Sequence, residues 1–395
     1  MWTLYRAYLK CFFAFPMPPG LQPKQVLFLL PDLAFGGVER ITLNLLRHLP
    51  VNLFTCDLFT CGTSTAMACE LPAAVRHFSG VDSGLRMRQA FPRLVTRLRN
   101  LVHRYEVVVA TSPHTTALMH LACFGHKARK ISWVHFNSEN FLPSTGALIR
   151  VAARIAYPLT EERIFVSERV QKSFEACLGN KRGDCVIHNI FDPDSYIQSS
   201  RVAPTVKQLK STGKPILGVV SRLVEGKGLM DLIAIHQELR NRSFNHHLVV
   251  IGDGPLKNHL SQRIDALGLR DSFHLLGEDP SPLASMRLFD LLLLTSEHEA
   301  WPTVILEAFH AETPIVSFDC PSGPGEMLTG KLRAGLVPGR DPQVFANSVV
   351  QALTQRTELV GAGTRRLEEF MPERIIPYWV GYLLKERLSG PIYNA

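Results

Sequence analysis

The stretch LFDLLLLTSEHEAWPTVILEAF, residues 288–309, joins an apolar run to an amphipathic segment through a short acidic loop. Four consecutive leucines without polar alternation are typical of a parallel strand covered by helices on both faces. Pro302 suits the first turn of the helix that follows, because a proline there loses no helical hydrogen bond. The stretch therefore predicts a strand, a loop and a helix of an α/β fold, with Glu297, Glu299 and Glu307 beyond the end of the strand.

The same alternation of strand and helix recurs along the chain in two separate regions. Apolar runs alternate with helical patterns from Lys24 to Phe191 and again from Pro215 to about Phe370, and the Ser-, Thr-, Lys- and Pro-rich segment between them is predicted to be a linker. We expect an α/β protein of two doubly wound, Rossmann-like domains facing across a cleft, where open sheets bind ligands. The predicted divisions are an N-terminal tail (1–22), a first domain (23–195), a second domain (196–370) and a final helix packing across the domain boundary (371–395).

Composition narrows the class of protein. The formal net charge of +8 favours anionic partners such as phosphates or acidic lipids. The 8 cysteines form no C-x-x-C pair, which favours reduced thiols in the cytoplasm over a zinc site. The sequence has no uninterrupted apolar window of about 18 residues, so no membrane span is predicted. Residues 1–22 are aromatic and basic, and three interpretations stay open for them: an interfacial anchor, a disordered tail or a misplaced start.

Two cations stand on a glycine-flanked loop in VVSRLVEGKGLMDLI, residues 219–233. Arg222 ends a predicted strand, and Lys227 lies between two glycines. A guanidinium and an ammonium so placed suit a diphosphate, whose charge they offset without a metal. The alternative from the residues alone is a pair of solvated cations on a loop.

Glycine turns mark two further strand ends. Gly36 and Gly37 precede a helix, and Gly252 and Gly254 form a G-x-G turn after another strand. Such turns let backbone amides approach an oxyanion, but they also serve simply as tight connections. In FHLLGE, residues 273–278, backbone groups around Leu275 are expected beside the cleft, where a planar base pairs with them.

The glutamates of the opening stretch have two interpretations. They are either solvated residues of a helix start, favoured by the helix dipole, or ligand contacts. Under the second interpretation, backbone amides around Trp301, Pro302 and Thr303 receive a phosphate. Glu307 then lies about 7.5 Å along the helix, within reach of the ribose of the same nucleotide, while Glu299 faces the group on the other side of the diphosphate. This arrangement argues against a glycosidase pair, whose carboxyl groups flank one bond.

These motifs follow one another in an order and spacing that resemble the retaining glycosyltransferases of family 4, which have the GT-B fold, over about residues 26–379. The family's E-x7-E signature is met by Glu299 and Glu307, and DCPSGPGEML, residues 319–328, resembles a segment of bacterial surface-glycan transferases. Ala300 departs from the family's usual glycine. The roles that the resemblance implies are a donor and acceptor loop (Gly36, Gly37), an active-site histidine near the donor sugar (His135), diphosphate binding (Arg222, Lys227), ribose binding (Glu307), contact with the transferred sugar (Glu299) and ends of two first-domain strands (Ser167, Asn189).

His135 ends the apolar run KISWVHFN, so from the residues alone it is equally interpreted as a satisfied core histidine. On the acceptor side, residues 84–105 carry Arg86, Arg93 and Arg97 with apolar residues at helical spacing. This basic amphipathic helix suggests an anionic membrane surface or a phosphorylated glycolipid, and a solvated basic face is the alternative.

The expected function is retaining transfer of a sugar from a nucleotide-diphosphate sugar to a saccharide or glycolipid acceptor. The resemblance favours a UDP-sugar and a product in bacterial lipopolysaccharide, O-antigen or capsule. No cofactor or metal is expected, and the expected location is cytoplasmic, with peripheral contact at the inner face of the membrane. A GT-B nucleotide-sugar 2-epimerase and a non-catalytic glycan-assembly subunit are the alternatives, whereas nucleic-acid binding is disfavoured because the arginine-rich helix lacks interleaved aromatic residues.

Overall fold

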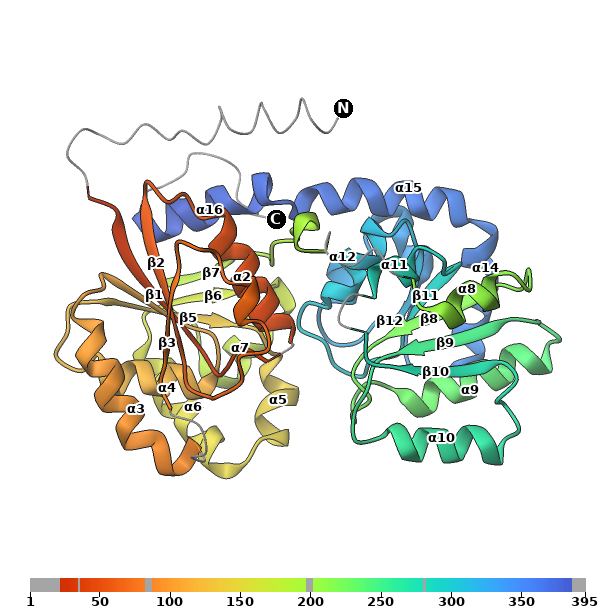
Figure 1. Ribbon diagram of the computed structural model, residues 1–395, viewed down its shortest axis with the longest axis horizontal. Coiled ribbons are helices and arrows are strands. Elements are labelled where there is room, and N and C mark those ends of the chain that lie inside the picture. Colours follow the sequence, from red (N-terminus) through yellow and green to blue (C-terminus); the bar gives the residue numbers. More distant parts are fainter. Residues whose placement is uncertain (1–21, 35, 82–86, 197–201, 280–281, 386–395) are drawn as a thin grey trace.

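The computed structural model describes residues 22–34, 36–81, 87–196, 202–279 and 282–385. Within them the chain forms two α/β domains side by side, each built on one sheet (Figure 1). The first sheet has seven strands in the order β3-β2-β1-β4-β5-β6-β7, and the second has six in the order β10-β9-β8-β11-β12-β13. The pairings within both sheets are parallel. The predicted fold class is thereby confirmed.

The strands are β1 (Lys24–Leu30), β2 (Phe54–Thr60), β3 (Arg76–Ser79), β4 (Val107–Ala110), β5 (Arg129–Val134), β6 (Glu162–Phe165), β7 (Gly183–Val186), β8 (Ile216–Val220), β9 (His247–Ile251), β10 (Phe273–Gly277), β11 (Leu291–Leu294), β12 (Ile315–Phe318) and β13 (Leu336–Val337). The helices of the first domain are α2 (Gly37–His48), α3 (Met87–Val102), α4 (Pro113–Ala122), α5 (Ser138–Ser144), α6 (Ala147–Leu159) and α7 (Glu168–Leu178), with 3-10 turns at Ala68–Glu70 and Pro193–Tyr196. The later helices are α8 (Pro204–Lys210), α9 (Leu229–Asn241), α10 (Lys257–Ala266), α11 (Leu283–Met286), α12 (Thr303–His310), α13 (Pro324–Met327), α14 (Pro342–Thr354), α15 (Arg356–Leu367) and α16 (Pro372–Leu384), with 3-10 turns at Gly330–Gly335 and Glu368–Phe370.

The central strands are apolar throughout because helices cover both faces of each sheet. In β1, Val26 and Phe28 belong to the core beneath α2, while Leu27 and Leu29 point to the other face and pack with α3 and α4. Strand β4, the sequence VVVA, is buried at every residue. Continuous apolar runs therefore identify the inner strands of both domains.

Two elements were not expected from the sequence. Strand β3 has the sequence RHFS and lies at the edge of the first sheet, so its side chains are partly or fully exposed. Helix α8 lies inside the predicted linker, where Val206 and Leu209 are buried against the second domain. Both were missed because neither presents an extended apolar run.

The last helix returns to the first domain (Figure 1). The Trp379 ring of α16 lies 4.7 Å from the Trp133 ring and 6.5 Å from the Phe28 ring, centroid to centroid. Arg129 Nη1 donates a hydrogen bond of 2.7 Å to the Leu383 carbonyl, close to the end of the same helix. The first domain is thus assembled from two separate parts of the chain. In the described residues, no helix is both long and apolar enough to cross a bilayer.

Candidate functional site

An ion pair lies at the carboxyl end of the second sheet. Lys227 Nζ is 2.6 Å from Glu299 Oε1, which brings the loop after β8 against the loop after β11. The Thr295 hydroxyl donates to the Lys227 carbonyl at 2.9 Å. Gly228 allows this contact because it has φ +63° and a Cβ there would lie 1.9 Å from the Thr295 carbonyl oxygen. Two residues that the sequence assigned to adjacent groups of a ligand, the diphosphate and the transferred sugar, therefore contact each other directly.

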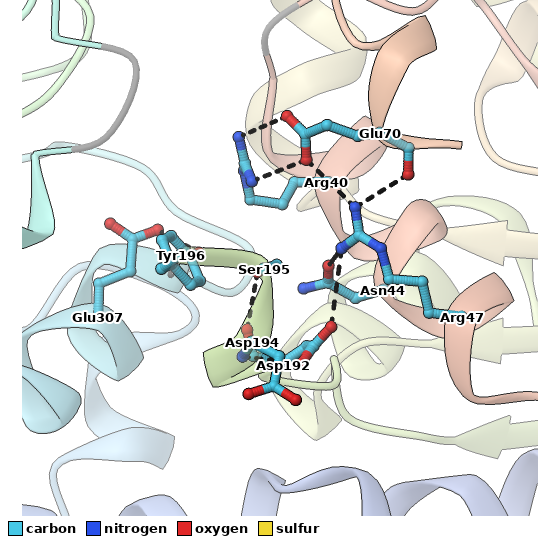
Figure 2. A network of polar contacts seen from close by, with 9 residues as sticks. All are labelled: Arg40, Asn44, Arg47, Glu70, Asp192, Asp194, Ser195, Tyr196 and Glu307. Atoms are coloured by element: carbon cyan, nitrogen blue, oxygen red, sulfur yellow. Dashed lines mark hydrogen bonds and ion pairs between the residues drawn. The ribbon is translucent and has the colours of Figure 1, made fainter. Parts of the chain in front are cut away.

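Glu307, the second glutamate of the E-x7-E signature, comes from α12 and is partly buried. The Tyr196 hydroxyl, from the segment that joins the two domains, donates a hydrogen bond of 3.0 Å to Glu307 Oε1 (Figure 2). Burial raises the pKa of Glu307, and the hydrogen bond from Tyr196 and the charge of Arg40 act in the opposite direction. The Arg40 guanidinium lies 5.4 Å from the centroid of the Tyr196 ring. A carboxylate so desolvated suits bonding to ligand hydroxyls.

A polar network holds α2 against the segment that leaves the first domain (Figure 2). Arg40 and Arg47 both form ion pairs with Glu70, at 3.2 and 3.3 Å. Arg47 and His48 also approach the buried Asp192 carboxylate, at 3.7 and 3.3 Å. Burial alone would raise the pKa of Asp192, but the hydrogen bond and charge of His48 and the charge of Arg47 outweigh it and lower that pKa. Helix α2 is therefore tied to the segment that leaves the first domain.

The glycine pair lies at the start of α2. Gly36 is the N-cap, and a Cβ there would lie 2.2 Å from Glu39 Oε2, whereas a Cβ on Gly37 would meet open space. Burial raises the pKa of Glu39, the charge of Asp32 adds to this effect, and Arg222 of the second domain opposes it. Glu39 thus lies at the helix start within electrostatic reach of Arg222. Sequence reasoning missed Glu39, although FGGVER places it three residues after the N-cap.

The G-x-G turn supports the loop that carries Arg222. A Cβ on Gly252 would lie 1.9 Å from the Ser221 carbonyl oxygen, and one on Gly254 would lie 2.4 Å from that of Leu223. Both glycines also have positive φ, +146° and +159°. The turn needs glycine because the backbone of the neighbouring loop packs closely against it. This packing explains both glycines without a bound ligand. Leu275 lies on the edge strand β10, where it pairs with Val250 of β9.

The start of α12 combines a buried aromatic ring with backbone amides that no described side chain caps. The Trp301 ring stacks on His188 of the first domain, with centroids 4.4 Å apart and planes 14° apart, so the ring belongs to the domain interface. Pro302 is the N-cap and α12 begins at Thr303, one residue later than predicted. No side chain of the described residues caps this helix start. Its first amides are thus available to an anion.

Ala300, where the resembled family usually has glycine, is not strained. Of the described residues other than glycine, those with positive φ are Ser243, Glu312 and Lys385. Gly323, at φ +86°, lies against this loop, and a Cβ on it would be 2.5 Å from Pro302 Cδ. The alanine therefore fits the loop without the left-handed conformation that would disfavour it.

His135 directly follows β5 and is partly buried, with its ring centroid 4.4 Å from that of Trp133. Burial lowers the pKa of His135 to about 3, so the imidazole is neutral. Its Nε2 is buried and has no hydrogen-bond partner among the described residues. A buried polar atom of this kind normally has a partner, which a ligand hydroxyl would supply.

A carboxylate of the second domain caps a helix of the first. Glu326 of α13 accepts hydrogen bonds from the backbone amides of Glu168 and Arg169, at 2.8 and 3.1 Å, which are the first two residues of α7. The Ser167 hydroxyl caps the same helix by accepting from the Val170 amide. Glu326 lies in the segment DCPSGPGEML, residues 319–328, for which the sequence predicted no role of this residue.

Further contacts surround this capped helix start. Arg169 pairs with Asp319 at 2.8 Å, and Asn137 Nδ2 donates to the Ser322 hydroxyl at 3.3 Å. Asn189 is buried, and its Oδ1 has no hydrogen-bond partner among the described residues. The domains are therefore joined by polar contacts beside the candidate site.

The predicted basic helix is α3. Its apolar residues Leu94, Leu98 and Val102 are buried, and Arg93 and Arg97 are exposed. The Arg97 guanidinium also donates to the Gly80 carbonyl at 3.1 Å. Arg86 lies outside the described residues, as do residues 1–21 of the predicted tail.

Comparisons with known proteins identify the family. The model "Glycosyltransferase Family 4" matches residues 35–195, and the model "Glycosyl transferases group 1" matches residues 204–365. The structure of Anabaena Alr3699/HepE in complex with UDP and glucose superimposes with a TM-score of 0.74, at 22% identity, over 92% of this chain and 100% of that one. The chain belongs to the GT-B glycosyltransferases.

Two curated relatives are themselves named glycosyltransferases, and one of them is named for amylovoran biosynthesis. The amylovoran biosynthesis glycosyltransferase AmsD of Erwinia amylovora is 23% identical over 67% of this chain and 72% of its own length. An uncharacterised glycosyltransferase of Methanocaldococcus jannaschii is 30% identical, but the match spans only 37% of this chain and 36% of that protein.

Proposed function

We propose that this GT-B glycosyltransferase is a retaining family 4 enzyme that transfers a hexosyl group from a UDP-sugar to a saccharide or glycolipid acceptor. The observation that carries the proposal is the arrangement of the two signature glutamates around the uncapped start of α12. Glu299 precedes that helix and is paired with Lys227, and Glu307 lies within the helix as a partly buried carboxyl group. A nucleotide diphosphate needs this combination of an anion site between two acceptors for hydroxyl groups.

Each residue then has one role towards the donor. Arg222, Lys227 and the first amides of α12 bind the diphosphate, and Glu307 binds the ribose hydroxyls. Lys227 leaves Glu299 when the diphosphate arrives, so Glu299 becomes free to bind the transferred sugar. Because two cations and a helix start offset the charge of the leaving group, the reaction is expected to need no metal and no cofactor.

Two features complete the donor site in this proposal. The free Nε2 of His135 accepts or donates a hydrogen bond at the sugar, and backbone groups of β10 at Leu275 pair with the base. In the transfer step, the bond from the anomeric carbon to the diphosphate oxygen breaks and the bond to the acceptor oxygen forms on the same face. The acceptor's proton passes to the departing phosphate oxygen. The neutral, low-pKa imidazole of His135 is consistent with a role in positioning rather than in proton transfer.

The acceptor is proposed to be a growing bacterial surface glycan on a lipid carrier, as in lipopolysaccharide, O-antigen or capsule synthesis. Support comes from the likeness to AmsD, which is named for amylovoran biosynthesis. The HepE structure was determined with UDP and glucose, which supports the choice of a UDP-hexose. Exposed arginines on α3, Arg93 among them, favour peripheral contact with the cytoplasmic face of the membrane.

The test is a reaction of the purified enzyme with mixed nucleotide sugars and extracted bacterial glycolipid, read by mass spectrometry. We expect one hexose to be added from a UDP donor with its anomeric configuration retained. Glu299→Ala and Glu307→Ala should each lose the activity, whereas Glu297→Ala, which alters an exposed glutamate outside the signature, should keep it. Turnover by Glu299→Ala or Glu307→Ala at the wild-type rate would refute the assigned roles.

The same reaction separates the two alternatives. A sugar altered without consumption of acceptor would identify a nucleotide-sugar 2-epimerase. Calorimetric binding of UDP-sugars without any turnover would identify a non-catalytic subunit.

A further inference from the structure

One side of the first domain exposes an unusual number of apolar side chains. Six large ones on or next to α4 and α6 are between 51% and 78% exposed. They are Leu121, Phe124, Leu148, Val151, Ile155 and Leu159. Isolated exposed apolar residues are normal on a protein surface, but a contiguous group marks a surface that contacts something.

The six residues form one contiguous surface, here named the α4–α6 surface. Leu148, Val151, Ile155 and Leu159 recur every three or four residues, so they share one face of α6. The opposite face of α6 is buried through Ala153, Ala156 and Tyr157, which shows that the helix is correctly packed.

Helices α4 and α6 pack side by side on the same face of the first sheet. The His120 ring nitrogen Nε2 is 2.7 Å from the Thr160 hydroxyl, which joins the C-terminal ends of the two helices. Leu121 and Phe124 therefore extend the apolar stripe of α6.

The helices that carry and border this surface have basic residues but no acidic ones. The sequences of α3, α4 and α6 contain no aspartate or glutamate. Exposed arginines lie on both helices next to the apolar residues: Arg93, Arg97 and Arg99 on α3, and Arg154 on α6. Arg99 Nη1 donates to the Phe124 carbonyl at 3.1 Å, which places one of these cations at the edge of the stripe.

We propose that the α4–α6 surface enters the headgroup region of an anionic phospholipid bilayer, while the arginines of α3 contact the lipid phosphates. Apolar side chains bordered by cations match such an interface, where acyl chains lie beneath negative headgroups. A second copy of the chain fits less well, because a two-fold contact would set each copy's arginines against those of the other. This proposal rests on the proposed function in one respect, namely that the acceptor lies in a membrane.

The surface differs from the one that sequence reasoning favoured. In α3, Leu94, Leu98 and Val102 face the core while Arg93, Arg97 and Arg99 are exposed, so α3 supplies mainly charge. Helix α6 supplies the apolar contact. Arg93 and Arg97 then act at the edge of the membrane-binding surface rather than at its centre.

The test is co-sedimentation of the full-length protein with vesicles of phosphatidylglycerol and phosphatidylcholine in equal parts. The variant Val151→Ser/Ile155→Ser should lower the partition coefficient by about tenfold or more, because two apolar side chains no longer enter the acyl region. The matched control Val344→Ser/Val350→Ser alters two exposed valines on α14 of the second domain and should bind like the wild type. Binding of the wild type should also fall when phosphatidylglycerol is omitted or salt is raised.

Two results would overturn the proposal. One is wild-type binding by the Val151→Ser/Ile155→Ser variant. The other is a dimer in analytical ultracentrifugation, without vesicles, that this variant dissociates, because the occupant would then be a second copy. Calorimetric binding of UDP, which involves the other domain, should be equal in all variants. It therefore separates failure of this proposal from failure of the proposed donor site.

Discussion

The carboxylate of Glu326 allows a quantitative test of how the two domains are held together. It accepts two hydrogen bonds from the first amides of α7, across the domain boundary. In Glu326→Gln the side chain keeps one acceptor oxygen, and its amide group leaves the other backbone N–H without a partner. A hydrogen bond to a charged group contributes about 1.5–3 kcal/mol. Loss of one such bond should therefore disfavour the joined arrangement of the domains by about 10- to 150-fold.

We expect Glu326→Gln to slow transfer by up to that factor, because Glu299 and His135 lie on different domains and must face the same sugar. UDP binding, measured by calorimetry, should change little, since its proposed contacts lie mainly in the second domain. Small-angle X-ray scattering should report a larger radius of gyration for the variant.

A matched control uses the other cap of the same helix. Ser167→Ala removes a cap that lies within the first domain, so it should lower stability by about 1 kcal/mol and leave the radius of gyration unchanged. Wild-type transfer by Glu326→Gln would refute the reasoning. An equal increase in the radius of gyration for Ser167→Ala would show instead that helix fraying, and not the domain contact, is responsible.

Three further predictions concern single residues. The pKa of Glu307 is raised from its ordinary value of 4.5, so wild-type stability should fall as pH rises from that value through the raised pKa; Glu307→Gln should remove this slope in urea titrations at several pH values, and an unchanged slope would contradict it. Trp301→Ala should lower the free energy of unfolding by about 3–5 kcal/mol, because it removes a buried aromatic ring from the domain interface; a loss below about 1 kcal/mol by denaturant titration would argue against that role. Gly252→Ala should weaken UDP binding by displacing Ser221, whereas Gly268→Ala, at a positive φ with open space, should only lower thermal stability; equal UDP affinity in both would refute this account.

The inner strands could be predicted because burial on both faces leaves a readable apolar run. VVVA of β4 and LLLL of β11 are examples, since every residue in them is buried. RHFS of β3 could not be recognised because an edge strand is half exposed and carries no such run. Helix α8 was hidden for a related reason: its two buried residues, Val206 and Leu209, are too few to show a period.

The positions of candidate site residues could be predicted where a sequence motif fixes a residue's place relative to the end of a strand. This holds for Lys227 and Glu299, which follow β8 and β11 and form an ion pair. Tyr196 could not be assigned, because its hydrogen bond to Glu307 joins residues 111 positions apart. Glu326 likewise acts on a helix of the other domain. Contacts across the domain boundary depend on tertiary structure and leave no local pattern.

The route of the chain between the domains has a mechanical consequence. The segment leaving the first domain and the segment returning to it as α16 run past each other, and the Phe191 amide donates a hydrogen bond of 2.8 Å to the Phe370 carbonyl. Two crossings joined in this way act as a two-point hinge. A connection of this kind restricts twisting and sliding of one domain against the other more than it restricts rotation about the line through the two crossings. Because Trp379 is anchored beyond this hinge in the core of the first domain, removal of the last helix would destabilise that core and the hinge together.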